Sequence, residues 1–149
     1  ASSLGLTGDM TISCWIYVIS LNNLASCLSK TLANIPAPFD YYVSTNGLIF
    51  FLRGNGSTYE LVRATNHITT GAWHFIAVTM NGTSVTHYLD GSPNGTGTIS
   101  TNIANGSGHA IIGNRSDGAT KTNGYIDDVR LYNRALSPAE IQALYNLAD

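Results

Sequence analysis

Charged side chains are scarce in this sequence. They make up 11% of the 149 residues, with seven Lys and Arg against nine Asp and Glu and a formal net charge of −2, whereas about 25% is usual for a soluble domain. The basic residues are scattered, so no positive stripe exists to neutralise a phosphate backbone, and nucleic acid is not an expected partner. The surface must instead be built from Asn, Thr, Ser and Gly, which favours an extracellular, cell-surface or virion protein.

A long hydrophobic run is also missing. The longest apolar stretches, such as residues 48–52, fall far short of the roughly 20 residues that span a bilayer. We therefore expect no insertion into a membrane. The chain is nevertheless long enough to bury a hydrophobic core as one domain, without a metal or a disulfide scaffold.

Glutamate is nearly absent, and its scarcity bears on catalysis. Only Glu60 and Glu140 occur, whereas glycoside hydrolysis needs two carboxyl groups that flank the scissile bond. Glu140 has the position of a helix-capping acid, and Glu60 stands alone in a predicted strand. The only adjacent acids, Asp127 and Asp128, should point to opposite faces of a strand. We therefore expect no enzyme activity and no catalytic residue.

Asn-Gly and Asp-Gly dipeptides are abundant. They begin at residues 46, 55, 81, 90, 94, 105, 117 and 123. Asn, Asp and Gly accept the positive φ that two-residue hairpin turns of type I′ require. Because these dipeptides separate short runs rich in Ile, Val, Thr, Tyr and Phe, the sequence predicts an antiparallel β protein.

The apolar runs predict the layout of the fold. Strands are expected at about residues 10–18, 25–30, 40–45, 48–53, 58–65, 73–80, 84–90, 109–114 and 124–133. So many strands favour two stacked sheets, because each sheet can then bury an inner face. One short C-terminal helix is predicted after Ser137, which has the position of an N-cap. Pro138 occupies the first helical position, and Glu140 is a capping-box acid.

Three segments resemble a known family. They are residues 6–16 (LTGDMTISCWI), residues 73–91 (WHFIAVT leading to YLDG) and residues 124–137 (GYIDDVRLYNRALS). They resemble the signatures of laminin G-like jelly-roll domains of the concanavalin A-like lectin/glucanase superfamily. The resemblance implies an all-β, two-sheet antiparallel sandwich of the jelly-roll type, as a single domain over residues 1–149.

The resemblance also implies a function. It implies a non-catalytic module that binds carbohydrate or glycoprotein within a larger secreted or surface protein. The alternative is a structural or assembly module of a virion, fibre or cell-surface layer that contacts copies of itself. Members of the family usually begin with a further strand that this sequence lacks. An open sheet edge is therefore expected, where a second copy can add a strand to form a homo-oligomer.

Asp127 is the main candidate for a metal ligand. Strand alternation places it on one face with Tyr125, Val129 and Leu131. If that face is the core, the buried carboxylate must be satisfied by backbone N–H groups or by an ion. A structural hydrogen-bond role and a calcium site are both open. Calcium sites occur in relatives but often use the missing first strand, so no cofactor is required here. The weaker calcium candidates are Asp9 and Asp128.

Cys14 and Cys27 are the only cysteines. They lie in consecutive predicted strands, in a register that is symmetric about a loop near residues 20–21. That register would set them opposite one another, where a cross-strand disulfide can form. Two small buried thiols are the alternative.

Aromatic side chains with a polar edge are suited to carbohydrate, because the ring stacks on a sugar face while neighbouring amides bind the hydroxyls. Trp15 and Trp73 lie inside predicted strands and are expected in the core. The candidate ligand-binding residues lie in or near strand ends and loops. They are Tyr41, Tyr42, Arg53, Tyr59, Asn114, Arg115 and Asp117.

Overall fold

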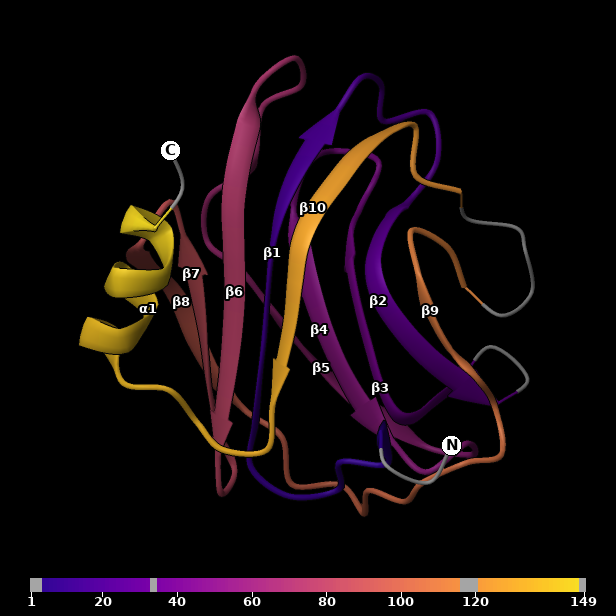
Figure 1. Ribbon diagram of the computed structural model, residues 1–149. Helices are drawn as coiled ribbons and strands as arrows, with labels where there is room; N and C mark the ends of the chain where they lie inside the picture. Colours follow the sequence, from indigo (N-terminus) through magenta and orange to yellow (C-terminus); the bar gives the residue numbers. More distant parts are fainter. Residues whose placement is uncertain (1–3, 33–34, 116–120, 148–149) are drawn as a thin grey trace.

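Two antiparallel five-stranded sheets face one another in the computed structural model, which describes residues 4–32, 35–115 and 121–147 (Figure 1). We call the sheet with the order β10-β1-β6-β7-β8 the β6 sheet and the sheet with the order β5-β4-β3-β2-β9 the β3 sheet. The sandwich predicted from the sequence is confirmed. The elements are β1 (Met10–Val18), β2 (Ala25–Leu32), β3 (Ile35–Val43), β4 (Ile49–Gly54), β5 (Tyr59–Arg63), β6 (Trp73–Asn81), β7 (Ser84–Leu89), β8 (Ser92–Thr98), β9 (Ala110–Ile112), β10 (Gly124–Tyr132) and α1 (Pro138–Asn146).

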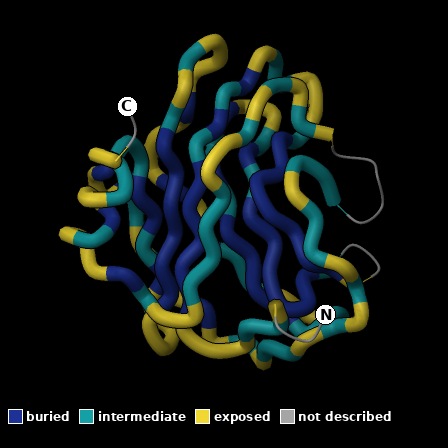
Figure 2. The backbone as a smooth tube through the Cα atoms, viewed as in Figure 1, coloured by how far each residue is buried: buried dark blue, intermediate teal, exposed yellow. Residues whose placement is uncertain are grey.

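The main core lies between the two sheets. In β1, Ile12, Cys14 and Ile16 are fully buried against the other sheet, while Trp15 and Tyr17, which alternate with them, point to the outer face. The facing strands supply rings, such as Phe39 and Phe51. Figure 2 shows that the buried stretches coincide with the central strands and that the turns are exposed. Alternation along the strands therefore builds the core.

The β7–β8 hairpin both confirms and corrects the turn predictions. Asp90 (φ 49°) and Gly91 (φ 84°) form the expected two-residue turn. The expected turn at Asn94–Gly95 is wrong, because both residues lie inside β8, at an irregularity in its pairing with β7. Asn94 is only 3% exposed, and its side-chain oxygen accepts the amide of Asn66 at 2.8 Å. Here the dipeptide serves as a bulge that ties a neighbouring loop to the sheet.

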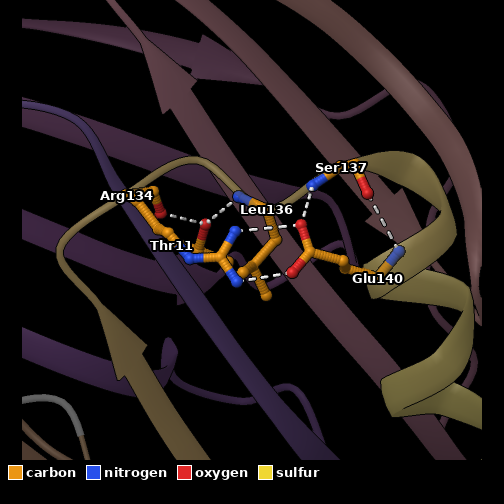
Figure 3. A network of polar contacts seen from close by, with 5 residues as sticks. All are labelled: Thr11, Arg134, Leu136, Ser137 and Glu140. Carbon is orange, nitrogen blue, oxygen red and sulfur yellow. Dashed lines mark hydrogen bonds and ion pairs between the residues drawn. The ribbon is translucent and has the colours of Figure 1, made fainter.

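The C-terminal helix begins as predicted. The Ser137 side chain accepts the Glu140 amide (3.2 Å), and the Glu140 carboxylate accepts the Ser137 amide (3.0 Å). Arg134 binds the same carboxylate with two nitrogens (Figure 3). The Arg134 guanidinium, followed by the Ser137 amide, lowers the pKa of Glu140 to about 2.

A buried threonine ties the segment before α1 to the β6 sheet. Thr11, in β1, donates its hydroxyl to the Arg134 carbonyl (2.8 Å) and accepts the Leu136 amide (2.9 Å), as Figure 3 shows. Leu136 and Ile141 then pack on Phe75 in a second hydrophobic cluster on the outer face of the β6 sheet. The helix therefore covers part of that outer face.

Candidate functional site

The uncovered part of the same outer face carries an aromatic cluster. Tyr17 in β1 pairs in register with Trp73 in β6 on one side and with Tyr125 in β10 on the other. Trp73 is 45% exposed and Tyr125 is 59% exposed. The cluster lies where β1 ends and where β6 and β10 begin, in the upper part of Figure 1. We call these three residues the aromatic platform.

Ring contacts fix the shape of the platform. The ring of Tyr17 meets Trp73 (5.7 Å between centroids, 64°) and Tyr125 (5.8 Å, 61°) edge to face. The rings of Trp73 and Tyr125 are 6.4 Å apart and inclined by only 36°. Tyr17 therefore packs against both exposed rings and limits the orientations open to them. The expectation that Trp73 lies in the core is therefore wrong.

Several predicted ligand-binding residues meet on the other side of the molecule. Tyr42 in β3, Phe50 in β4 and Arg63 in β5 form one cross-strand row on the outer face of the β3 sheet, and Tyr59 lies four residues before Arg63 on the same face of β5. Burial and then the Asp40 carboxylate raise the pKa of Tyr42, and nearby Arg115 and Arg63 oppose that shift. We call this cluster the Tyr42 face, and it consists of Tyr42, Phe50, Tyr59, Arg63 and Arg115.

The rings of the Tyr42 face are largely used by the protein itself. Tyr42 and Phe50 stack on one another (5.4 Å, 6°). The Arg63 guanidinium lies 5.7 Å from the centroid of Phe50. Of its aromatic residues, Tyr59 is the most open, at 50% exposure. The Tyr42 face therefore offers fewer free ring surfaces than the aromatic platform does.

Tyr41 does not reach a binding surface. It is fully buried in the core, where its ring packs on Phe51 (6.1 Å) and His87 (6.3 Å). Burial raises its pKa well above the ordinary value. The neighbouring positions Tyr41 and Tyr42 point to opposite faces of β3, so only one of them can serve a ligand. The prediction that Tyr41 binds ligand is wrong.

Arg53 is likewise a structural residue. It is fully buried, and burial lowers its pKa to about 10. Its guanidinium donates to the carbonyls of Pro38 (3.1 Å), Gly8 (3.2 Å) and Leu6. Arg53 therefore ties the segment before β1 to the sandwich, and its prediction as a ligand-binding residue is also wrong.

The remaining predicted ligand-binding residues follow β9. Asn114 accepts the Arg115 amide with its own side chain at 2.9 Å, and Arg115 lies close enough to Tyr42 to affect its titration. Asp117 lies outside the described residues. Three of the residues predicted to bind ligand, Tyr42, Tyr59 and Arg115, therefore lie in the Tyr42 face.

Asp127 is exposed, and it does not share a face with Val129 and Leu131 as strand alternation predicts. The pairing of β10 with β1 runs from Asp127–Trp15 to Arg130–Ser13, so β10 has one extra residue there. Asp128 takes up the excess with a φ of 52°. The bulge shifts the alternation, so Tyr125 and Asp127 face outward while Val129 and Leu131 pack on the core.

The three predicted calcium ligands do not meet. The carboxylate of Asp9 accepts the Gly82 amide at 2.7 Å, and that of Asp128 accepts Arg130 Nε at 3.1 Å. Asp9 is six residues along the chain from Trp15, the partner of Asp127, a distance of about 20 Å in an extended strand. In the described part of the chain, no three His, Cys, Asp or Glu side chains gather in a group that could hold a metal ion.

Both glutamates have structural contacts. Glu60 accepts the amides of Ser100 and Thr101, each at 2.6 Å, which fixes the loop after β8 to β5. Glu140 caps α1. The two carboxylates therefore hold different parts of the backbone.

Cys14 and Cys27 are neighbours across the core and not on paired strands. Strand β1 belongs to the β6 sheet and strand β2 to the β3 sheet. They face each other across the core as free, fully buried thiols. Burial, and then a side-chain hydrogen bond with Cys27, raises the pKa of Cys14 well above its ordinary value. The expected register is wrong, although the two thiols are neighbours.

The fold and the sequence together define the family. Residues 1–142 match the laminin G-like family described as the concanavalin A-like lectin/glucanases superfamily. The chain therefore belongs to this family, and the resemblance seen in its three sequence segments is confirmed. Within the described residues, no helix is long and apolar enough to cross a bilayer.

Individual relatives are distant. The chain is 27% identical over 150 residues to adhesion G-protein coupled receptor V1 of Danio rerio, an alignment that covers 95% of this chain and 2% of the receptor. Its fold is similar to the CBM40 of the Ruminococcus gnavus IT-sialidase bound to α2,3-sialyllactose (16% identity, TM-score 0.78, 97% of this chain and 86% of that one). It is also similar to the heptameric SAP-like pentraxin of Limulus polyphemus (20% identity, TM-score 0.65, 93% and 70%).

Proposed function

We propose that this chain is a non-catalytic module that binds carbohydrate or glycoprotein through the aromatic platform. The observation that carries the proposal is the pair of exposed, pre-positioned rings of Trp73 and Tyr125. Such rings stack on the apolar face of a sugar while polar groups at their edge bind the hydroxyls. Asp127, which is exposed two residues from Tyr125 on the same face, supplies an acceptor at that edge.

Kinship supports the proposal. One structural neighbour binds α2,3-sialyllactose, and one sequence relative is an adhesion receptor. A place outside the cell or on a cell surface agrees with these relatives, and the weakly charged composition agrees with these places and with a virion. The structural roles of Glu60 and Glu140 support a binding role without catalysis.

A glycan array, probed with and without calcium, tests the proposal. We expect binding that Trp73→Ala and Tyr125→Ala each reduce by at least tenfold, because each removes one stacking ring. Tyr59→Ala is the matched control, since Tyr59 has similar exposure but lies on the Tyr42 face. Binding that Tyr59→Ala abolishes and Trp73→Ala preserves would assign the ligand to the Tyr42 face. The absence of binding to every glycan, in both conditions, would reject the function.

Self-assembly is the second candidate. It is favoured by the outer strands β10 and β9, each of which pairs with one strand only among the described residues, and by the exposed rings, which a second copy can cover. Light scattering across a wide concentration range separates the candidates. A mass that rises with concentration in the wild type but not in Trp73→Ala supports assembly through the platform, whereas a strict monomer at high concentration contradicts assembly.

A further inference from the structure

A cavity lies away from the aromatic platform. It has a volume of about 430 Å³, within the usual range for small-ligand pockets. Its walls are Leu4, Lys30 in β2, the loop of residues 105–109 and Ala110 at the start of β9. Lys30 and Ala110 are paired in register, so the cavity sits at the β9 edge of the β3 sheet.

Lys30 is the unusual residue of this cavity. Only 3% of it is exposed. Its ammonium group donates to the side-chain oxygen of Asn105 (2.7 Å) and to the carbonyl of Gly106 (2.7 Å). Both acceptors are neutral, and the third N–H of the ammonium has no acceptor among the described residues.

The ammonium group of Lys30 has only neutral partners in the part of the chain that the structure describes. Within the described part of the chain, no carboxylate forms an ion pair with Lys30. An ammonium group that is partly withdrawn from water is stabilised by an accompanying opposite charge. Burial accordingly lowers the pKa of Lys30. An anion in the cavity would supply the missing charge and the third acceptor.

The loop that holds Lys30 is closely fitted. A Cβ on Gly108 would lie 2.0 Å from the Thr31 carbonyl oxygen, and a Cβ on Gly5 would lie 2.4 Å from the Asn105 side-chain nitrogen. The Gly106 amide donates to the Ala37 carbonyl at 3.1 Å. The contacts of Gly106 and Gly108 fit this loop closely against β2 and β3, so the Gly106 carbonyl that accepts from Lys30 is held by the backbone.

We propose that this cavity binds a small anionic group, a carboxylate or a sulfate ester, with Lys30 as its counter-charge. The ammonium keeps its bonds to Asn105 and Gly106 and gives its third N–H to the anion. His109, the other titratable residue that lines the cavity, adds a donor at the rim. The proposal does not depend on the aromatic platform, because the two sites share no residue.

The test exploits a simple feature of the chain, which contains only two lysines, Lys30 and Lys121. Protein labelled with ¹⁵N in the lysine side chains and in the backbone is titrated with acetate, methyl sulfate and glucuronate, at constant ionic strength set by sodium chloride. Lys121, which is exposed, is the internal control. We expect a saturable shift of the Lys30 ammonium and Gly106 amide signals, with no saturable change at Lys121, and a rise in the pKa of Lys30 when the anion is bound.

The variant Lys30→Met should weaken binding at least tenfold, and Lys121→Gln should leave it unchanged. Lys30→Met is expected to fold, because replacing an uncompensated buried charge by an apolar side chain of similar length relieves its desolvation cost. Saturation by glucuronate assigns the anion to a sugar acid, and saturation by acetate or methyl sulfate alone assigns it to a free anion. Wild-type titrations in which no probe gives a saturable Lys30 shift, or in which Lys121 responds equally, would overturn the proposal even if the variant failed to fold.

Discussion

Two rows of aromatic side chains stand on the same outer face of the β6 sheet, and their surroundings are opposite. In one row, Trp15 and Phe75 are register partners, 5.5 Å apart, and Tyr145 of α1 covers them. The next row, two residues along each strand, consists of the aromatic platform. It has no helix over it, and Trp73 and Tyr125 stay exposed. Residues of the same type thus form a second core in one row and a surface in the other.

The difference between the rows comes from the reach of α1. A helix of nine residues is only about 13 Å long, and the Thr11 contacts fix where its leading segment crosses the sheet. Gly91 lies against the helix, since a Cβ there would be 2.8 Å from the Tyr145 ring. The helix therefore sits over the Trp15 row and beside β8. The comparison of the two rows shows that an aromatic residue in a strand is buried or exposed according to what covers the sheet.

The largest effect is expected in the covered row. Phe75→Ala should lower the free energy of unfolding by about 3–5 kcal/mol, because it removes a ring buried under α1 and leaves a cavity. Chemical denaturation measures the change. A loss below about 1 kcal/mol would show that α1 does not make the row a core.

Acid should lower the free energy of unfolding through His87, which is buried in the core beneath both rows. Burial of the His87 ring lowers its pKa from 6.5 to about 4, so between these values the unfolded chain binds a proton that the folded chain does not. The contribution of neutral His87 to the free energy of unfolding is fully present above pH 6.5. The free energy of unfolding should fall by about 3 kcal/mol as the pH drops to 4. His87→Gln should remove that slope. The variant Trp15→Phe keeps only Trp73, in the platform row, and Trp73→Phe keeps only Trp15, in the covered row. Fluorescence of the two variants should report the same midpoint of acid unfolding.

The tether of the helix should have an intermediate effect. Thr11→Val keeps the shape of the side chain but removes the bonds to the Arg134 carbonyl and the Leu136 amide. We expect a loss of about 1–3 kcal/mol in the free energy of unfolding. In the Trp73→Phe background, the fluorescence of Trp15 should move towards that of an exposed indole. An unchanged Trp15 signal would mean that the tether does not position α1.

The bare row should matter little for stability. Trp73→Ala and Tyr125→Ala should each cost less than about 1 kcal/mol, because the rings are half exposed and lose only cross-strand contacts. Comparison with Phe75→Ala under the same denaturation conditions is the check. A loss as large as that of Phe75→Ala would contradict the distinction between the rows.

The smallest effect is expected in the quenching of tryptophan fluorescence. Acrylamide should quench Trp73 in the Trp15→Phe protein several times more strongly than it quenches Trp15 in the Trp73→Phe protein, since only Trp73 lies outside the cover of α1. A glycan that binds the platform should protect Trp73 and leave Trp15 unaffected. Equal quenching of the two tryptophans would remove the contrast.

Much of the fold could be predicted because its signals are local. The two-residue turn at Asp90–Gly91 and the capping box at Ser137–Glu140 both depend on residues within a few positions of each other. The start of β3 and the whole of β8 escaped prediction. Pro36, Pro38 and Pro93 lie in these segments, and proline is a weak strand signal because it lacks an N–H for the ladder.

The candidate site was harder to predict. Alternation can tell that Tyr41 and Tyr42 face opposite ways, but it cannot tell which face is the core. The bulge at Asp128 then reverses the alternation within β10, which places Asp127 on the opposite face from Val129 and Leu131. Tyr17, Trp73 and Tyr125 are 56 and 52 residues apart along the chain, so no local pattern could join them.

The sequence by itself determined the sandwich, the capped helix and the family, because turn dipeptides, periodicity and capping residues act over short distances. Only the tertiary structure decided which aromatic residues are exposed and that Lys30 has only neutral acceptors among the described residues. Those properties depend on strand order, on one bulge and on the placement of a nine-residue helix. They arise from contacts between distant segments, which a single sequence does not specify.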